Sequence, residues 1–340
     1  MTLHTFSGER ILAELESSGE WRSLTAVPRK YQYFIQESYF RESWEVAVSV
    51  LGPGILGSLQ RFAMLALKPE CILGRKSEAV LEYMARNGFR PVIAQPFRYD
   101  RHRTREIWRF QWNIATLDRL QLGDLLHTAA DAILVLFVDE HTNTGLPGSV
   151  RLAGLKGSSL PWERSREHLR THLEALNRMI VFVHCSDEPV DIVRELGILF
   201  DPAQLRDLYG RMSAALSGQV GGDVATALAN VYKRFPARPL DVTEATRRVR
   251  KQLARVQGPG MAAARRADLA LVTAIESDCK LDWRTWNADL SEAGRSPAQW
   301  DEILVATQYI LHDVPDVRCI ISESGRERWL AGEGRWCPWP

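Results

Sequence analysis

The chain has 340 residues, a length that predicts about two domains rather than one small core. Its 43 Lys and Arg residues nearly balance 42 Asp and Glu residues, which argues against a protein that binds nucleic acid or an anionic membrane through bulk charge. Hydrophobic residues make up 45% of the sequence, enough to exclude disorder as the main state. The 11 tryptophans are more than average usage gives, and we expect them in cores, interfaces or ligand pockets.

The five cysteines are odd in number and widely separated, and no two are spaced as Cys-x-x-Cys. This pattern indicates neither a disulfide framework nor a zinc finger. The first ten residues lack a basic segment followed by an apolar run, and no stretch approaches the roughly 20 apolar residues of a membrane span. We therefore expect a soluble, cytoplasmic protein without a membrane partner.

Residues 1–58 are predicted to form a mainly helical N-terminal extension. Within it, residues 44–50 alternate as a strand does, until Gly52-Pro53-Gly54 interrupts the pattern. The basic and aromatic segment 29–40 fits either base stacking or packing against the next domain. Packing is favoured because no long basic run accompanies these residues.

Residues 59–210 alternate short apolar strands with amphipathic helices. Strands are predicted at 62–67, 89–94, 132–138 and 179–183, and helices at 77–87, 105–126 and 190–200. This order predicts an α+β domain in which helices cover a small sheet.

Residues 211–340 are predicted to be mostly helical. A capping box at 241–244 opens a basic helix that contains Arg247, Arg248 and Arg250. A solvated helix face is the ordinary interpretation of such a helix, and a nucleic-acid interface is the less favoured one.

One segment places an imidazole where a reactive group is expected. His184 follows the fourth predicted strand, and Glu195 lies eleven residues later in the helix that comes next. A carboxylate bonded to one ring nitrogen fixes the tautomer and leaves the other nitrogen free as a nucleophile. Taken singly, each residue also has an ordinary structural interpretation, at a strand end or on a helix surface.

Three further positions carry groups that suit phosphate. Lys68 follows the first strand, where its ammonium can act as a point charge. Ser159, in the segment 157–161, and Arg170 would add hydrogen-bond donors for phosphate oxygens. The chain has no Gly-rich Walker loop, so side chains would have to hold the phosphate.

Together these segments resemble the nucleoside diphosphate kinase family, from Arg61 to about Tyr209. The residues that carry the resemblance are, in the family's order, Leu67-Lys68-Pro69-Glu70, Asn87-Gly88-Phe89, Gly157 to Pro161, Leu169-Arg170 and His184-Cys185-Ser186-Asp187. The glutamate that assists the family's histidine matches Glu195 in its spacing.

The resemblance implies a ferredoxin-like βαββαβ core and ping-pong phosphoryl transfer. A phosphohistidine at His184 would take the γ-phosphoryl group of ATP or another NTP and pass it to a nucleotide or another phosphorylated small-molecule acceptor. Glu195 would orient the imidazole, Ser186 would support it by a hydrogen bond, and Mg²⁺ would arrive with the nucleotide rather than at a protein metal site. The nucleotide and its phosphates would be contacted by Lys68, Ser159, Arg170, Arg151 and Trp108. A homo-oligomer is also implied, because the family assembles as hexamers or tetramers.

Several positions depart from the family's pattern, two of them close to His184 in the sequence. Val181 stands where the family has an asparagine that touches the sugar, and Cys185 replaces the glycine after the histidine. The alternative function is therefore a non-catalytic nucleotide-binding or scaffolding module. Trp108, Trp112 and Trp162 lie where the sequence departs most, which makes them candidates for a remodelled acceptor pocket.

Overall fold

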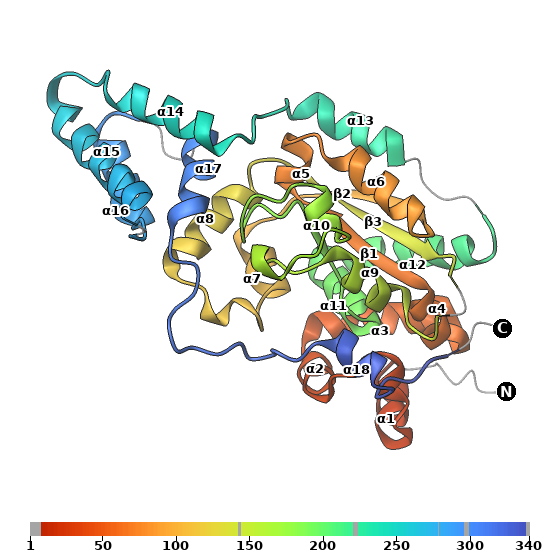
Figure 1. The fold of residues 1–340 in the computed structure, drawn as a ribbon. Helices are drawn as coiled ribbons and strands as arrows, with labels where there is room; N and C mark the ends of the chain where they lie inside the picture. The colour runs from red at the N-terminus through yellow and green to blue at the C-terminus, as the bar shows by residue number, and fades with distance from the viewer. Residues whose placement is uncertain (1–7, 142–143, 220–223, 278, 296–298, 338–340) are drawn as a thin grey trace.

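The computed structural model describes residues 8–141, 144–219, 224–277, 279–295 and 299–337. At its centre lies a four-stranded sheet with the strand order β2-β3-β1-β4, in which all neighbouring strands are antiparallel. The strands are β1 (Phe62–Leu67), β2 (Phe89–Phe97), β3 (Ala132–Asp139) and β4 (Val183–Cys185). Helices surround this sheet, so the chain is of the α+β class (Figure 1).

The sheet is buried on both faces. Within β1, Ala63, Leu65 and Leu67 enter one hydrophobic core, and Met64 and Ala66 enter the other. Successive side chains of a strand point to opposite faces, so a strand covered on both sides must be apolar throughout. This explains why β1 and β3 are visible in the sequence as uninterrupted apolar runs.

The N-terminal helices cover one face together with two helices from the centre of the chain. These helices are α1 (Gly8–Ser18), α2 (Pro28–Phe34), α3 (Ser38–Leu51), α4 (Ile55–Arg61), α11 (Pro189–Leu199) and α12 (Pro202–Leu216). Helix α11 lies so close to α3 that a Cβ on Gly197 would come within 2.1 Å of the Tyr39 carbonyl oxygen. Only glycine fits this contact.

The strand predicted at 44–50 is wrong, because these residues lie within α3. Phe40, Trp44 and Ala47 are buried at spacings of four and three residues, which is the helical period. The alternation seen in the sequence extends over too few residues to exclude that period.

The opposite face is covered by helices from the centre and the C-terminal part of the chain. Nearest the sheet are α5 (Pro69–Leu73), α6 (Ser77–Arg86), α8 (Leu117–His127), α9 (Gly148–Lys156), α10 (Leu169–His172) and α13 (Val224–Arg234). Farther out lie α14 (Val242–Leu253), α15 (Met261–Glu276), α16 (Trp283–Glu292) and α17 (Trp300–Tyr309), of which α16 and α17 contact α8 (Figure 1). The single helix predicted at 105–126 is wrong: α7 (Arg101–Ile107) and α8 are separated by a 3-10 turn at Trp112–Ile114.

The arginines of the basic helix α14 are engaged in ion pairs. Arg247 pairs with Glu244 on the same helix, Arg248 with Asp301 on α17, and Arg250 with Asp268 on α15. Helix α14 therefore uses Arg248 and Arg250 to bind its neighbours.

Elsewhere in the C-terminal region, Trp283 and Trp286 are fully buried.

An extended segment, here called the C-terminal strap (residues 310–321), leads from α17 toward α18 (Gly325–Leu330) (Figure 1). It follows residues 110–116 through backbone hydrogen bonds, including those from Thr116 N to His312 O and from Val314 N to Ile114 O. In the parts of the chain that the structure describes, no helix has the length and apolar composition that a membrane span requires.

Candidate active site

His184 is held on the short edge strand β4. It lies opposite Ala66 of β1, with Val183 and Cys185 facing the other core. The predicted strand 179–183 is displaced, because Phe182 has a φ of 66° and interrupts the ladder. A left-handed backbone at a bulky residue just before His184 is a local strain that the surrounding packing must hold.

The imidazole and Glu195 meet as the sequence predicts. Nε2 of His184 lies 2.9 Å from a carboxylate oxygen of Glu195, and the hydroxyl of Ser186 donates to the same oxygen at 3.2 Å. Among the described residues, none hydrogen-bonds to Nδ1. A carboxylate that accepts the Nε2 proton leaves the lone pair on Nδ1, which is the state a nucleophilic histidine requires.

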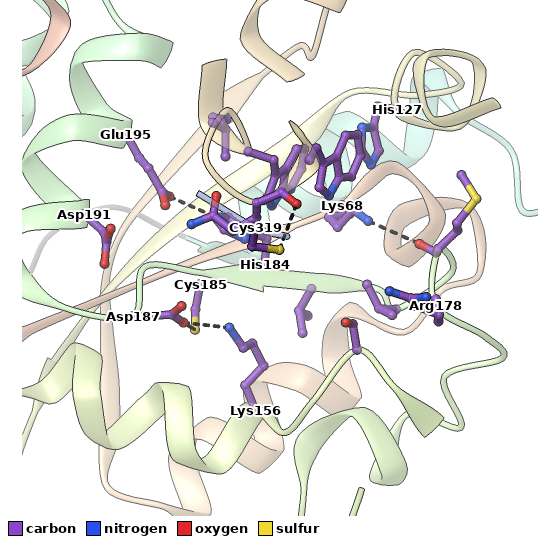
Figure 2. Close-up of a pocket in the computed structure, with 18 of the residues that line it drawn as sticks. Lys68, His127, Lys156, Arg178, His184, Cys185, Asp187, Asp191, Glu195 and Cys319 are labelled. Carbon is purple, nitrogen blue, oxygen red and sulfur yellow. Dashed lines mark hydrogen bonds and ion pairs between the residues drawn. The ribbon is translucent and has the colours of Figure 1, made fainter. Parts of the chain in front are cut away.

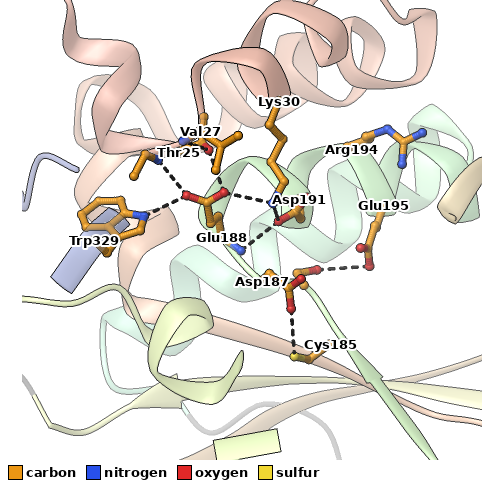
Figure 3. A network of polar contacts seen from close by, with 12 residues as sticks. Thr25, Val27, Lys30, Cys185, Asp187, Glu188, Asp191, Arg194, Glu195 and Trp329 are labelled. Atoms are coloured by element: carbon orange, nitrogen blue, oxygen red, sulfur yellow. Dashed lines mark hydrogen bonds and ion pairs between the residues drawn. The ribbon is translucent and has the colours of Figure 1, made fainter. Parts of the chain in front are cut away.

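Helix α11 positions Glu195 through its own N-terminus. Pro189 occupies the first turn, and Glu188 and Asp191 form a reciprocal capping box. Glu188 is fully buried and also accepts from the Thr25 hydroxyl, the Lys30 ammonium and the Trp329 indole (Figure 3). The start of α11 is thereby tied both to the N-terminal extension and to α18.

His184 lines a cavity of about 310 Å³ (Figure 2). Cations outnumber carboxylates in its wall: seven Lys or Arg residues against Asp187, Asp191 and Glu195. The seven are Lys30, Lys68, Arg119, Lys156, Arg170, Arg178 and Arg194. Carboxylates outside the lining pair with four of these cations: Glu70 with Lys68, Asp313 with Arg119 and Arg178, and Glu37 with Arg194. Concave, partly buried cations favour an anionic ligand where a carboxylate does not already neutralise them.

Lys68 lines this cavity and is almost fully buried. Its ammonium pairs with Glu70 at 2.8 Å and lies 5.8 Å from the centre of the Trp108 ring. Burial lowers the pKa of Lys68, and the nearby charges of Arg170 and Arg119 act in the same direction. An anion bound beside Lys68 would offset the free-energy cost of keeping its ammonium charged in this buried place.

Ser159 and Arg170 also line the cavity. The Arg170 guanidinium donates to the carbonyl oxygens of Gly157 and Val183 at 2.9 and 3.1 Å, so it fastens the loop that carries Ser159 to β4. Its Nε is buried without a partner in the described chain, and burial lowers the pKa of Arg170 to about 10. Arg170 is therefore a buried cation with no carboxylate partner and spare donor capacity.

Arg151 does not reach the cavity, which corrects its predicted place among the phosphate ligands. Two of its nitrogens bind the Asp139 carboxylate at 2.7 Å, and one of them also donates to the Asn87 carbonyl. These bonds and its stacking over Phe89 hold Arg151 beside the start of β2 and the end of β3.

The place predicted for Trp162, in a remodelled acceptor pocket, is also wrong. Its side chain is 74% exposed on a surface turn.

Trp108 and Trp112 are both part of the cavity wall. Their rings stack at 4.7 Å, and the Trp108 ring meets His184 edge-on at 5.1 Å. His127 packs against both indoles, and its burial holds the pKa of its imidazole well below the ordinary value. An uncharged, aromatic part of the cavity wall thus lies against His184.

Several charged residues at the cavity could not be singled out from the sequence. Lys156 pairs with Asp187 at 2.9 Å and Lys30 with Asp191 at 2.7 Å, while Arg119 and Arg178 share Asp313 on the strap. Asp187 belongs to the segment that carries His184 and could have been suspected on that ground. Arg119, Arg178 and Asp313 are isolated in the sequence, and no local pattern distinguishes them from surface residues.

No protein-family model matches the sequence, and no curated protein matches it. Among solved structures, a nucleoside diphosphate kinase of Aquifex aeolicus is 14% identical with a TM-score of 0.34, over 42% of this chain and 95% of that one. An apo nucleoside diphosphate kinase from Encephalitozoon cuniculi is 12% identical with a TM-score of 0.34, over 41% of this chain and 87% of that one. Both superpositions are loose, so the α+β class rests on the strand order and pairing of the sheet.

Proposed function

We propose that this protein is a phosphotransferase that moves the γ-phosphoryl group of a nucleoside triphosphate through a phosphohistidine at His184. The observation that carries the proposal is the His184–Glu195 contact of 2.9 Å, in a cavity whose wall includes Arg170, a buried cation without a carboxylate partner among the described residues. Phosphoryl transfer depends chiefly on positioning and on stabilising charge, and this cavity supplies both.

In the proposed reaction the lone pair on Nδ1 of His184 attacks the γ-phosphorus. A nitrogen–phosphorus bond forms, the bond to the bridging oxygen breaks, and the nucleoside diphosphate leaves with that electron pair. An oxygen of the acceptor then attacks the phosphorus, and the nitrogen–phosphorus bond returns its electrons to the imidazole. Glu195 keeps the proton on Nε2 throughout and balances the charge that develops on the ring.

Lys68 and Arg170 are proposed to stabilise the transferring phosphoryl group, with Ser159 donating from the loop beside them. Lys68 is a point charge at the end of β1, and Arg170 has an unpartnered Nε. The three cavity carboxylates are already engaged by Lys156, Lys30 and His184. Mg²⁺ is accordingly proposed to arrive on the nucleotide's phosphates.

The proposal also includes the finer fold assignment, a ferredoxin-like βαββαβ core. The strand order β2-β3-β1-β4 with antiparallel neighbours supports it, as do the helices α5 and α6 between β1 and β2 and α9 between β3 and β4.

The test is to incubate the purified protein with Mg²⁺ and γ-³²P-labelled ATP. We expect protein-bound label that is lost in acid and kept in base, as a phosphoramidate should be. His184→Ala should abolish it, whereas His102→Ala, an exposed residue of α7, should leave it unchanged. Absence of label at saturating Mg²⁺-ATP would refute the proposal for this donor.

A nucleotide-binding module without catalysis is the second candidate. It is favoured by Val181, which presents an apolar side chain to the cavity, and by the ion pairs that already engage most cavity cations. It predicts calorimetric binding of Mg²⁺-ATP with no label on the wild-type protein, and the labelling experiment separates the two functions.

A further inference from the structure

Arg119 and Arg178 converge on one carboxylate at the edge of the cavity. The guanidinium of Arg119 on α8 binds one oxygen of Asp313, and Nη2 of Arg178 binds the other at 2.6 Å. Asp313 belongs to the C-terminal strap, about 190 residues beyond Arg119 in sequence. The two arginines thus hold a planar oxyanion between them.

Both arginines keep donor capacity that the protein does not use. The Nε atoms of Arg119 and Arg178 are buried and have no hydrogen-bond partner among the described residues. Arg119 itself is 93% buried, and burial lowers its pKa. Buried donors are normally satisfied, so these two guanidinium groups have capacity for a ligand with more acceptor oxygens than the one carboxylate of Asp313.

The pair is continuous with the candidate active site. The Arg119 guanidinium lies 5.1 Å from the centre of the Trp112 ring, Trp112 stacks on Trp108, and Trp108 contacts His184. Lys68 links the same region from the other side, since its ammonium lies 3.4 Å from the carbonyl oxygen of Met179, the neighbour of Arg178. A ligand could therefore span from the arginine pair to the imidazole along one cavity wall.

We propose that Arg119 and Arg178 form an oxyanion-binding subsite and that Asp313 occupies it when no ligand is bound. The group bound there is a phosphate or a carboxylate, the two oxyanions that a pair of guanidinium groups recognises in this geometry. Asp313 can leave while its backbone stays in place, because the strap is held by backbone bonds between 312–314 and 114–116. As a consequence that rests on the proposed function, the acceptor of the phosphoryl group carries an anionic group that this subsite holds.

The test measures binding of inorganic pyrophosphate and of malonate by calorimetry to the wild-type protein and to Asp313→Asn. A side chain that competes for the subsite multiplies the apparent affinity by the fraction of time that the subsite is free. Neutralising Asp313 raises this fraction and should tighten binding of one of these anions about tenfold. A gain for pyrophosphate identifies a phosphate subsite, and a gain for malonate alone identifies a carboxylate subsite. No gain for either anion overturns the proposal.

Two variants make the result specific. Asp187→Asn removes a negative charge from the same cavity without touching Arg119 or Arg178, and it should produce a clearly smaller gain. An equal gain would show a general charge effect and would overturn the proposal. Arg178→Gln in the otherwise wild-type chain should weaken binding of the same anion. This measurement tests the proposal even if Asp313→Asn fails to fold.

The proposal can fail separately from the proposed function. The gain in Asp313→Asn should persist when His184→Ala is added, because it depends on the arginine pair alone. Labelling by γ-³²P-ATP, in contrast, depends on His184 and not on the tighter anion binding of Asp313→Asn.

Discussion

The two sides of the cavity differ in how they are built. On one side, the histidine wall (β4, α11 and the end of β1), regular elements position His184, Glu195 and Lys68. The other side is here called the strap wall (residues 108–119, Arg178 and the C-terminal strap). Its groups come from turns, from the start of α8 and from an extended segment far along the chain.

The difference teaches which parts of a site depend on local structure. On the histidine wall each group follows from its position in a strand or a helix and from the cap that starts that helix. On the strap wall Asp313 acts only because tertiary packing brings residues 312–314 against 114–116. The histidine wall can thus be tested by changing the buried residues that support α11. The strap wall can be tested by changing the charged and titratable residues that the strap places beside Arg119 and Arg178.

The largest effect is expected at the buried support of the histidine wall. Glu188→Gln removes the charge that Lys30 faces and weakens the bonds from Thr25 and Trp329. Loss of one partner from a buried ion pair should lower the free energy of unfolding by about 3 kcal/mol in urea denaturation. Arg10→Gln, which breaks an exposed pair with Glu14, should change it little. A loss for Glu188→Gln as small as for Arg10→Gln would show that this network does not support α11.

The next effect tests the role of Glu195 as a positioning residue. Glu195→Gln keeps the shape of the side chain but can no longer hold a positive imidazole, and we expect the saturating rate of His184 phosphorylation to fall about 10²-fold. The ATP concentration that gives half this rate should stay the same, because the carboxylate that is changed hydrogen-bonds to the imidazole. A change in the half-saturating concentration alone would assign Glu195 to nucleotide binding instead.

The smallest effect concerns the strap wall and its dependence on pH. Burial, together with Arg119 and Arg178, lowers the pKa of His312 to about 4, from 6.5 in the unfolded chain. Between these values the unfolded state binds a proton that the folded state does not, so stability is lost as the pH falls from 6.5 toward 4.

His312→Asn should therefore remove about 2 kcal/mol of the acid-induced loss in stability. The measurement is the difference between wild type and variant in urea denaturation at both ends of this pH range, so that other titrating groups cancel. Identical pH dependence in the two proteins would mean that His312 is protonated as easily in the folded chain as in the unfolded one.

The sequence predicts the histidine wall well because its information is local. The apolar run of β1, the helix after His184 and the eleven-residue spacing to Glu195 each reflect a period or a cap. The displaced fourth strand could not be foreseen, since it depends on the left-handed backbone at Phe182. The apolar residues of 44–50 fit the period of a strand as well as that of a helix, and the helices that bury one face of α3 decide between the two.

The remaining errors at the site also have a tertiary origin. Arg151 has a cationic side chain close to the expected place, but Asp139 and the Asn87 carbonyl hold it elsewhere. Arg119 and Arg178 gain their role only from the shared contact with Asp313. Charges brought together across more than a hundred residues leave no periodic signal in a single sequence.

The most direct test of the account is to locate the phosphoryl group after incubation with Mg²⁺-ATP. Tryptic cleavage after Arg178 and Arg194 releases a peptide of residues 179–194 in which His184 is the one histidine. Mass spectrometry at neutral to basic pH should find one phosphoryl group on this peptide, and acid should remove it. A phosphoryl group on any other peptide, or none on the intact protein, would contradict the assignment of His184 as the nucleophile.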